Sequence, residues 1–273
     1  MERDALEHHE IFLSGLRVAV RSSCARTNRY LRCHWAAAST PIVEPDSLCE
    51  IEVIDDESPR IEIDGEVVWS DDERDYLVAG FEQCLYRLAF ARHRARLAVF
   101  HAAALATEGA TFVFAGPSGA GKSSLALAAV RRGWRYFTDE FVVTDGKRLW
   151  GWPRAIRFDA PEPGARRPSY LRGLDCDVDA VSSSPEAAPP YYRVPGDALE
   201  RAPRPAEEVR FVRIERGART ELTEVSAIVA LQQWTEASFF EPSVSLGALV
   251  GGSRAWHASW RHPDELIELI EAL

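Results

Sequence analysis

The stretch AGPSGAGKSS, residues 115–124, decides the fold class of this chain. It contains the pattern G-x-x-x-x-G-K-S, in which Lys122 is followed by Ser123. The β-type apolar run ATFVFAG (110–116) precedes it, and the helical pattern SSLALAAVRR (123–132) follows it. A strand, a glycine-rich loop and a helix in this order are typical of a phosphate-binding loop. The sequence therefore predicts an α/β fold with a phosphate site at this loop.

The residue types of the loop suit an anionic ligand. Glycine lets the backbone turn and approach a phosphate closely, and the first N–H groups of the following helix are donors at the positive end of its dipole. Lys122 adds a full positive charge, and the Ser123 hydroxyl can bind magnesium. We expect the nucleotide to be held by Gly116, Pro117, Ser118, Gly119, Ala120, Gly121, Lys122, Ser123 and Ser124.

The use of lysine supports this interpretation. The chain has 32 basic residues, and only Lys122 and Lys147 among them are lysine. An ammonium is a flexible point charge, whereas the guanidinium of arginine is a planar fork, so the two are not interchangeable. A lysine at this position, in a chain that otherwise uses arginine, indicates a need for the point charge.

Composition limits the partners and the compartment. The net charge of −10 argues against nucleic acid, although residues 131–172 carry ten basic and five acidic residues, a local balance of +5. This basic stretch suits a phosphorylated ligand, or else forms a solvated face. The sequence predicts no membrane span and no signal peptide. Five cysteines without a C-x-x-C pair favour a reducing cytoplasm over disulfides or zinc. The sequence leaves a homo-oligomer open.

Residues 1–70 show short β-type runs and predict a β-rich N-terminal segment. Within IEIDGEVVW, the Asp64-Gly65 pair predicts a tight hairpin. A long amphipathic helix should follow, with Ser70 as its N-cap and acidic residues in its first turn.

A histidine precedes the phosphate loop on the same predicted hairpin. Two β-type runs flank residues 107–109, and pairing of Ala106 with Thr111 would put His101 opposite Ala115 or the residue after it. A lone histidine is usually structural. This one has a geometric reason to lie near the phosphates, so both roles are open.

An acidic pair follows the next predicted strand, WRYFTDEFVV (134–143). A strand–helix–strand unit makes its two strands parallel, so this strand should end at the sheet edge that carries the phosphate loop. Asp139 and Glu140 lie there, where carboxylates can hold magnesium, order water or accept a proton from a hydroxyl. An ordinary acidic surface turn is the alternative. The next β-type element, GWPRAIRF (151–158), adds Arg154 as a further candidate catalytic residue.

The chain then changes character. Prolines punctuate residues 161–205, which predicts a mobile proline-rich loop: a lid, a substrate loop or a disordered segment. The C-terminal end predicts a strand and a helix with Pro263 at the first helical position.

The stretch from the histidine to the acidic pair, HAAALATEGATFVFAGPSGAGKSSLALAAVRRGWRYFTDE (101–140), resembles the catalytic domain of HPr kinase/phosphorylase and its relatives, which include kinases of lasso-peptide precursors. The resemblance is weaker through Arg157 and absent from residues 1–70. It implies a P-loop kinase core of the HPr kinase/PEP carboxykinase-like type, a mixed sheet with flanking helices. The kinase domain would span residues 71–273, with a mobile loop at 161–205.

The resemblance also implies roles for individual residues. Lys122 and the loop amides would bind the β- and γ-phosphates of ATP, and Ser123 would bind Mg²⁺ with Glu140 near the metal. Asp139 would be the base for an acceptor hydroxyl, with His101 beside it. HPr kinases carry an E-x-R-G-x-G signature beyond the acidic pair, which this chain lacks. The resemblance therefore does not extend to HPr as the acceptor or to the reverse phosphorolysis.

The sequence thus predicts an ATP-dependent kinase acting on a serine or threonine hydroxyl of a peptide or small protein, including a natural-product precursor. A kinase of a free amino acid or other metabolite is the first alternative. A nucleotide-gated sensor without catalysis is the second.

Overall fold

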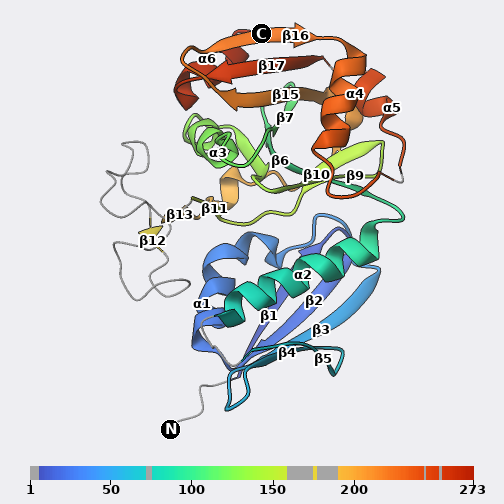
Figure 1. Ribbon diagram of the computed structural model, residues 1–273, viewed down its shortest axis with the longest axis vertical. Helices are drawn as coiled ribbons and strands as arrows, with labels where there is room; N and C mark the ends of the chain where they lie inside the picture. The colour runs from blue at the N-terminus through green and yellow to red at the C-terminus, as the bar shows by residue number, and fades with distance from the viewer. Residues whose placement is uncertain (1–5, 72–75, 159–174, 177–189, 243, 252–253) are drawn as a thin grey trace. The chain divides into compact units, whose positions relative to one another are not determined.

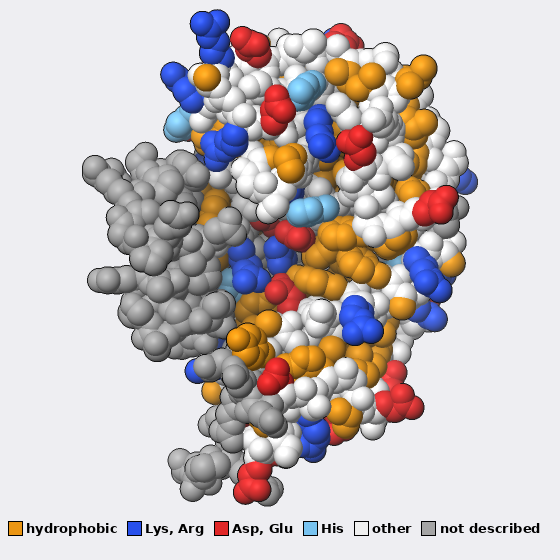
Figure 2. Space-filling model, in the orientation of Figure 1, with side chains coloured by type: hydrophobic (Ala, Val, Ile, Leu, Met, Phe, Trp, Pro, Cys, Tyr) orange, Lys and Arg blue, Asp and Glu red, His pale blue; other side chains and the backbone are white. Residues whose placement is uncertain are grey.

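The computed structural model describes the 273-residue chain except for residues 1–5, 72–75, 159–174, 177–189, 243 and 252–253 (Figure 1). The chain forms two compact units. Met1–Arg92 and Arg157–Arg193 make the first, and His93–Ile156 and Val194–Leu273 make the second. Acidic and basic side chains are interspersed over the face drawn in Figure 2. No helix among the described residues is long and apolar enough to cross a membrane.

The first unit is built on a sheet whose strands are ordered as in the sequence. These strands are β1 (Glu7–Leu13), β2 (Leu16–Ser22), β3 (Ser47–Ile54), β4 (Arg60–Ile63) and β5 (Glu66–Ser70). Neighbouring strands are antiparallel except β2 and β3, which are parallel. Parallel pairing needs a crossover connection, supplied here by the helix α1 (Ala25–His34) and the 3-10 turn η1 (Ala36–Ser39).

Alternation of apolar and polar residues gives this sheet one buried face. In β3, for example, Cys49, Ile51 and Val53 are buried while Glu50 is exposed. α1 and the long helix α2 (Leu77–His93) lie on one face of the sheet (Figure 1). Contact between α2 and β5 is close, because a Cβ on Gly80 would lie 2.6 Å from the Trp69 ring.

The hairpin predicted at Asp64-Gly65 is confirmed. Both residues have positive φ, 50° and 85°, and they join β4 to β5 through the pair Ile63↔Glu66. Ser70 differs from the expectation, since it is the last residue of β5 and not a helix N-cap. The described helix begins at Leu77 and groups with the sheet, so the first unit runs to Arg92 and does not end at residue 70.

The second unit has a mixed sheet in the order β14-β10-β9-β6-β7-β15-β17-β16, with β8 also paired to β6. The strands are β6 (Ala98–Ala106), β7 (Thr111–Ala115), β8 (Arg135–Thr138), β9 (Phe141–Thr144), β10 (Arg148–Gly151), β14 (Arg204–Pro205), β15 (Val209–Arg216), β16 (Glu221–Val225) and β17 (Ala255–Trp260). The helices are α3 (Lys122–Arg131), α4 (Ala227–Glu236), α5 (Gly247–Gly251) and α6 (Pro263–Glu271). The predicted mixed α/β class is therefore confirmed.

Strand directions bring several strand ends to one edge of this sheet. β6 is antiparallel to β7 in the predicted register, from Ala106↔Thr111 to Ala102↔Ala115. On its other side β6 is antiparallel to β8 and β9, so β7 and β8 run in the same direction with β6 between them. β15 is parallel to β7, and β17 is parallel to β15. The carboxyl ends of β7, β8, β15 and β17 therefore share one edge.

The strand predicted at 134–143 is interrupted after Thr138. The Thr138 hydroxyl accepts hydrogen bonds from the backbone N–H groups of Glu140 and Phe141, both at 3.1 Å. These amides bond to a side chain instead of to β6, and the interruption separates β8 from β9. Asp139 and Glu140 occupy the interruption.

The predicted mobile loop at 161–205 falls largely on residues 161–174 and 177–189, which lie outside the described residues. The described part contains short elements. β12 (Asp175–Cys176) pairs with β13 (Pro190–Tyr192), and the 3-10 turn η4 (Gly196–Ala198) and β14 come after them in the chain. β11 (Ile156–Arg157) precedes this region, and η5 (Ala206–Glu208) follows it. The C-terminal strand and helix are confirmed, with Pro263 at the start of α6.

Candidate active site

The phosphate loop joins β7 to α3, and its glycines are required by its geometry. Gly121 has φ of 91° and immediately precedes α3, and Gly119 has φ of 78°. Side chains other than glycine rarely adopt such angles. A Cβ on Gly116 would lie 2.4 Å from the backbone oxygen of Ile214 on β15. The loop therefore turns tightly against the neighbouring strand.

Trp260, at the end of β17, packs against the phosphate loop. Its side chain is fully buried, and its indole Nε1 donates a 3.1 Å hydrogen bond to the backbone oxygen of Ala120. A Cβ on Gly121 would lie 2.3 Å from the indole ring. The shape of the loop thus depends on a residue 140 positions away in the chain.

Lys122 folds back across the loop. Its Nζ donates to the backbone oxygens of Gly116 at 3.0 Å and Pro117 at 3.4 Å. Burial lowers the pKa of Lys122, while the negative charges of Glu140 and Asp139 oppose that change. The ammonium is therefore held by two neutral carbonyl groups that an anionic ligand could replace.

Asp139 is anchored at both carboxylate oxygens. Its Oδ2 accepts a 2.7 Å hydrogen bond from the Ser123 hydroxyl of the phosphate loop, and its Oδ1 accepts one of 2.9 Å from the Tyr136 hydroxyl. The side chain is 1% exposed. Burial raises the pKa of the Asp139 carboxyl, whereas Arg154, whose Nε lies 3.9 Å from Oδ1, opposes the rise. The predicted proximity of Asp139 to the loop is confirmed as a direct hydrogen bond.

Glu140 and His101 complete the group of polar side chains around Asp139. Arg154 donates from Nη2 to Glu140 Oε2 at 3.0 Å, and His101 Nε2 lies 3.4 Å from Glu140 Oε1. Burial and the positive charges of Lys122 and Arg154 lower the pKa of His101 to about 4. The imidazole is therefore neutral at neutral pH, and its contact with Glu140 is not an ion pair.

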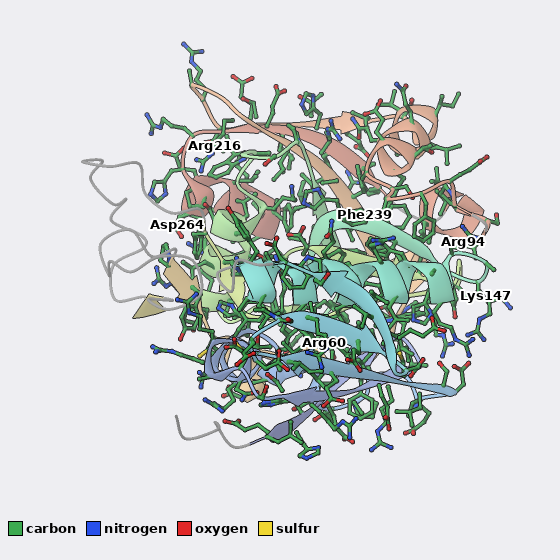
Figure 3. All side chains as sticks on the ribbon, turned by 60° about the horizontal axis from the view of Figure 1, so that its bottom comes forward. Arg60, Arg94, Lys147, Arg216, Phe239 and Asp264 are labelled. Atoms are coloured by element: carbon green, nitrogen blue, oxygen red, sulfur yellow. The ribbon has the colours of Figure 1, made fainter. Side chains whose placement is uncertain are left out.

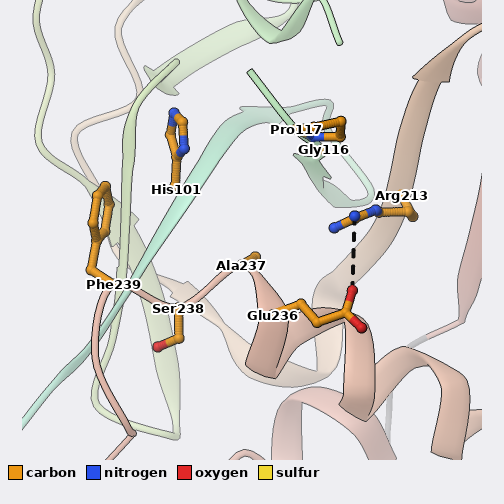
Figure 4. Close-up of a pocket in the computed structure, with 8 residues that line it drawn as sticks. All are labelled: His101, Gly116, Pro117, Arg213, Glu236, Ala237, Ser238 and Phe239. Atoms are coloured by element: carbon orange, nitrogen blue, oxygen red, sulfur yellow. Dashed lines mark ion pairs between the residues drawn. The ribbon is translucent and has the colours of Figure 1, made fainter. Parts of the chain in front are cut away.

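A cavity of about 360 Å³ opens beside this group (Figure 4). The segment after α4 forms one wall, because His101 donates its backbone N–H to Ala237 at 2.8 Å and Phe239 donates to Val99 at 3.0 Å. The His101 and Phe239 rings lie 5.6 Å apart. The lining residues are His101, Gly116, Pro117, Arg213, Glu236, Ala237, Ser238 and Phe239.

Sequence reasoning missed Arg213, Arg216 and the wall after α4. Arg213 pairs in register with Ala115, the last residue of β7, and its Nη2 lies 3.8 Å from a carboxylate oxygen of Glu236 (Figure 4). The only available signal was the β-type run EVRFVRIERG with its spaced arginines. Nothing in that run predicts that it lies beside the phosphate-loop strand.

The predicted site residues therefore come together in the second unit, with one difference in detail. Glu140 was expected near the metal, yet the Ser123 hydroxyl contacts Asp139, and Glu140 contacts Arg154 and His101. Over the described residues, no group of three or more His, Cys, Asp or Glu side chains could hold a metal ion. Magnesium at nucleotide sites takes one or two carboxylates together with phosphates and water, so the pair of Ser123 and Asp139 fits it.

Comparison with known proteins adds no family. No family model matches the sequence, and no curated protein is significantly similar to it.

Proposed function

We propose that this chain is an ATP-dependent kinase that transfers the γ-phosphate to a serine or threonine hydroxyl of a peptide or small protein, such as a natural-product precursor. One observation carries the proposal. The 2.7 Å hydrogen bond between Ser123 and the buried carboxylate of Asp139 joins the phosphate loop to a group that can accept a proton. The same pair suits Mg²⁺ at a nucleotide site, and the buried carboxylate is also placed to take the proton of an acceptor hydroxyl.

The loop supplies the groups that would bind the nucleotide. Its backbone N–H groups at the start of α3 would donate to the β- and γ-phosphates. The Lys122 ammonium, which now contacts the carbonyl groups of Gly116 and Pro117, would turn to the phosphate oxygens. Ser123, with Asp139 beside it, would hold Mg²⁺ together with the phosphates and water, and the ion neutralises charge on the phosphates when bound.

Asp139 would take the proton of the acceptor hydroxyl. The acceptor oxygen forms a bond to the γ-phosphorus, the bond from that phosphorus to the β–γ bridging oxygen breaks, and ADP leaves. Burial raises the pKa of Asp139, and Arg154 opposes the rise. The hydrogen bond between Arg154 and Glu140 holds the Arg154 guanidinium beside the Asp139 carboxylate, and neutral His101 adds no charge near that carboxylate.

Arg213 would assist at the outer phosphate. It lines the cavity beside Gly116, and a guanidinium near the transferred group stabilises the charge of the transition state. Its present partner, Glu236, is half exposed, so the pair can open at little cost.

The two lysines of the chain provide a matched test of nucleotide binding. Lys122→Ala should abolish ATP binding and leave the protein folded, whereas Lys147→Ala should keep ATP affinity, because Lys147 lies in the turn between β9 and β10. Calorimetric titration with Mg-ATP and a thermal melt of each variant give the answer. Unchanged affinity in a folded Lys122→Ala variant would refute the site.

A smaller acceptor is a second candidate, favoured by the cavity beside His101. Its volume of about 360 Å³ suits one amino acid, and Arg213 and Glu236 offer charges of both signs. Single-turnover transfer from labelled ATP to seryl peptides and to free amino acids separates the two acceptors. ATP binding without transfer to any hydroxyl offered would instead favour a sensor.

A further inference from the structure

Arg216 forms an ordered platform at the end of β15. Its guanidinium carbon lies 3.6 Å from the centre of the Trp260 indole ring, and its Nη1 donates to the backbone oxygen of Arg261 at 3.4 Å. Trp260 is fully buried and is itself tied to the phosphate loop. Arg216 remains exposed. A flat cation is therefore held on an indole, and its exposed side remains accessible to a ligand.

This platform borders the phosphate loop. A Cβ built on Gly121 would lie 3.1 Å from Arg216 Nη2, so the guanidinium reaches the residue that precedes α3. A ligand held by the loop amides would pass within reach of Arg216. Residues of the turn that follows Arg216 line a cavity of about 450 Å³. The lining residues are Ala218, Arg219, Thr220, Arg261, Glu265, Glu268 and Leu269.

The positions of Arg213 and Arg216 along β15 indicate which end of a nucleotide would meet this platform. β8, which leads to Asp139, and β6 lie on one side of β7, whereas β15 and β17 lie on the other. A γ-phosphate near Asp139 and Arg213, which pairs with Ala115 at the start of the loop, therefore directs the α-phosphate and the nucleoside toward Arg216, which lies near Gly121 at the other end of the loop. Figure 3 shows Arg216 well separated from Phe239, a residue of the cavity near His101.

We propose that the base of the bound nucleotide stacks on the exposed face of Arg216, with the ribose toward the adjoining cavity. This inference rests on the proposed nucleotide site and assigns the part of that site that binds the nucleoside. Planar guanidinium groups stack on nucleobases, and stacking tolerates any base. The fixed orientation on Trp260 means that little freedom is lost when the base binds.

Binding of two ligands tests the platform. Mg-ATP and Mg-tripolyphosphate share the phosphates, and only ATP carries a base. Arg216→Ala should raise the Kd for ATP about tenfold and change the Kd for tripolyphosphate by less than about twofold. Arg216→Lys should behave like Arg216→Ala, because lysine keeps the charge and loses the planar face.

Arg254 offers a matched control. Its guanidinium carbon lies 5.0 Å from the Trp256 ring centre, and it immediately precedes β17, at the opposite end of that strand from Trp260. Arg254→Ala should leave both affinities unchanged. Thermal melts of all variants report folding.

The outcomes are distinct. Equal loss of affinity for both ligands, or recovery of ATP binding in Arg216→Lys, would make Arg216 a phosphate contact and overturn the base platform. Unchanged affinity for ATP in Arg216→Ala would overturn it as well. If the parent protein bound neither ligand, the phosphate loop assignment would fail, and the platform with it.

Discussion

Arginine and carboxylate side chains pair in both units, and the surroundings of the pairs differ. On the open face of the first unit's sheet, Arg21 and Glu52 are cross-strand neighbours 2.7 Å apart, and their side chains are 44% and 31% exposed. In the second unit, Arg154 is 8% exposed and lies between Glu140 and the buried Asp139. The same two chemical groups form the contacts in each place.

The comparison shows that burial decides whether an arginine–carboxylate pair changes the pKa values of the groups around it. Water and salt screen exposed pairs, so they contribute little to stability. Around Arg154, burial raises the pKa of Asp139, and the arginine's charge helps lower that of His101. The following experiments test whether the contrast holds.

The largest contrast should be catalytic. Asp139→Asn keeps the shape of the side chain and removes the base, so phosphoryl transfer should fall by about 10²–10⁴-fold while ATP still binds. Glu52→Gln, the same type of change in the first unit, should leave transfer unaltered. Single-turnover transfer and ATP affinity, measured on the same samples, provide the comparison.

His101→Ala should cost less than Asp139→Asn, and the double variant should lose less than the product of the single losses, because the two residues act in one group. Full transfer by Asp139→Asn would mean that the site only positions the reactants and that Asp139 is not the base. The expected difference from Glu52→Gln would then be absent.

The next contrast concerns stability. Arg154→Ala leaves Asp139 and Glu140 without their guanidinium partner and should lower the free energy of unfolding by about 3 kcal/mol. Arg21→Ala should lower it by less than about 1 kcal/mol. Urea unfolding of both variants measures the difference. Equal losses would mean that burial does not distinguish the pairs.

His101 gives a titration test of the same environment. Its pKa should be about 4, well below the 6.5 of an exposed imidazole. Since the unfolded chain then binds the proton more readily, His101 should contribute stability that is complete above about pH 6.5 and is lost as the pH falls toward 4. NMR titration of the histidine signal that disappears in His101→Gln measures this pKa. A midpoint of 6.5 or above would contradict the assignment.

The smallest effect should be the coupling of the exposed pair. A double-mutant cycle on Arg21 and Glu52 should give about 0.2–1 kcal/mol at low salt and less at high salt. A large coupling that salt does not change would show that the exposed sheet face behaves like the buried site.

The sequence predicted the part of the site that is formed by elements adjacent in the chain. The hairpin register from Ala106 to Thr111, the turn glycines of the loop and the position of Asp139 depend on short links, and all are found in the structure. The interruption at Thr138 was not predicted, because it depends on a hydroxyl that bonds to the backbone two and three residues later.

The other half depends on long-range pairing. β15 lies beside β7 although Val209, which pairs with Thr111, is distant in sequence. No periodicity specifies such a partner, so Arg213 and Arg216 could not be assigned to the site. The extent of the first unit was missed because α2 packs on β5 through Gly80 and Trp69, a contact between side chain and backbone that alternation does not encode.

The pairing pattern around β6 also has a consequence for how the site assembles. β6, β7, β8 and β9 lie in one continuous stretch, 98–144, in which the phosphate loop and α3 link β7 to β8, and proteins gain such low-contact-order structure fastest. On the ribosome this stretch emerges before β15 and β17 exist, and chains generally fold from their N-terminal side. We expect the loop and its carboxylate to meet early in folding. The contacts of Trp260 and Arg216 with the loop should form last, so the fully shaped site marks the completion of the second unit.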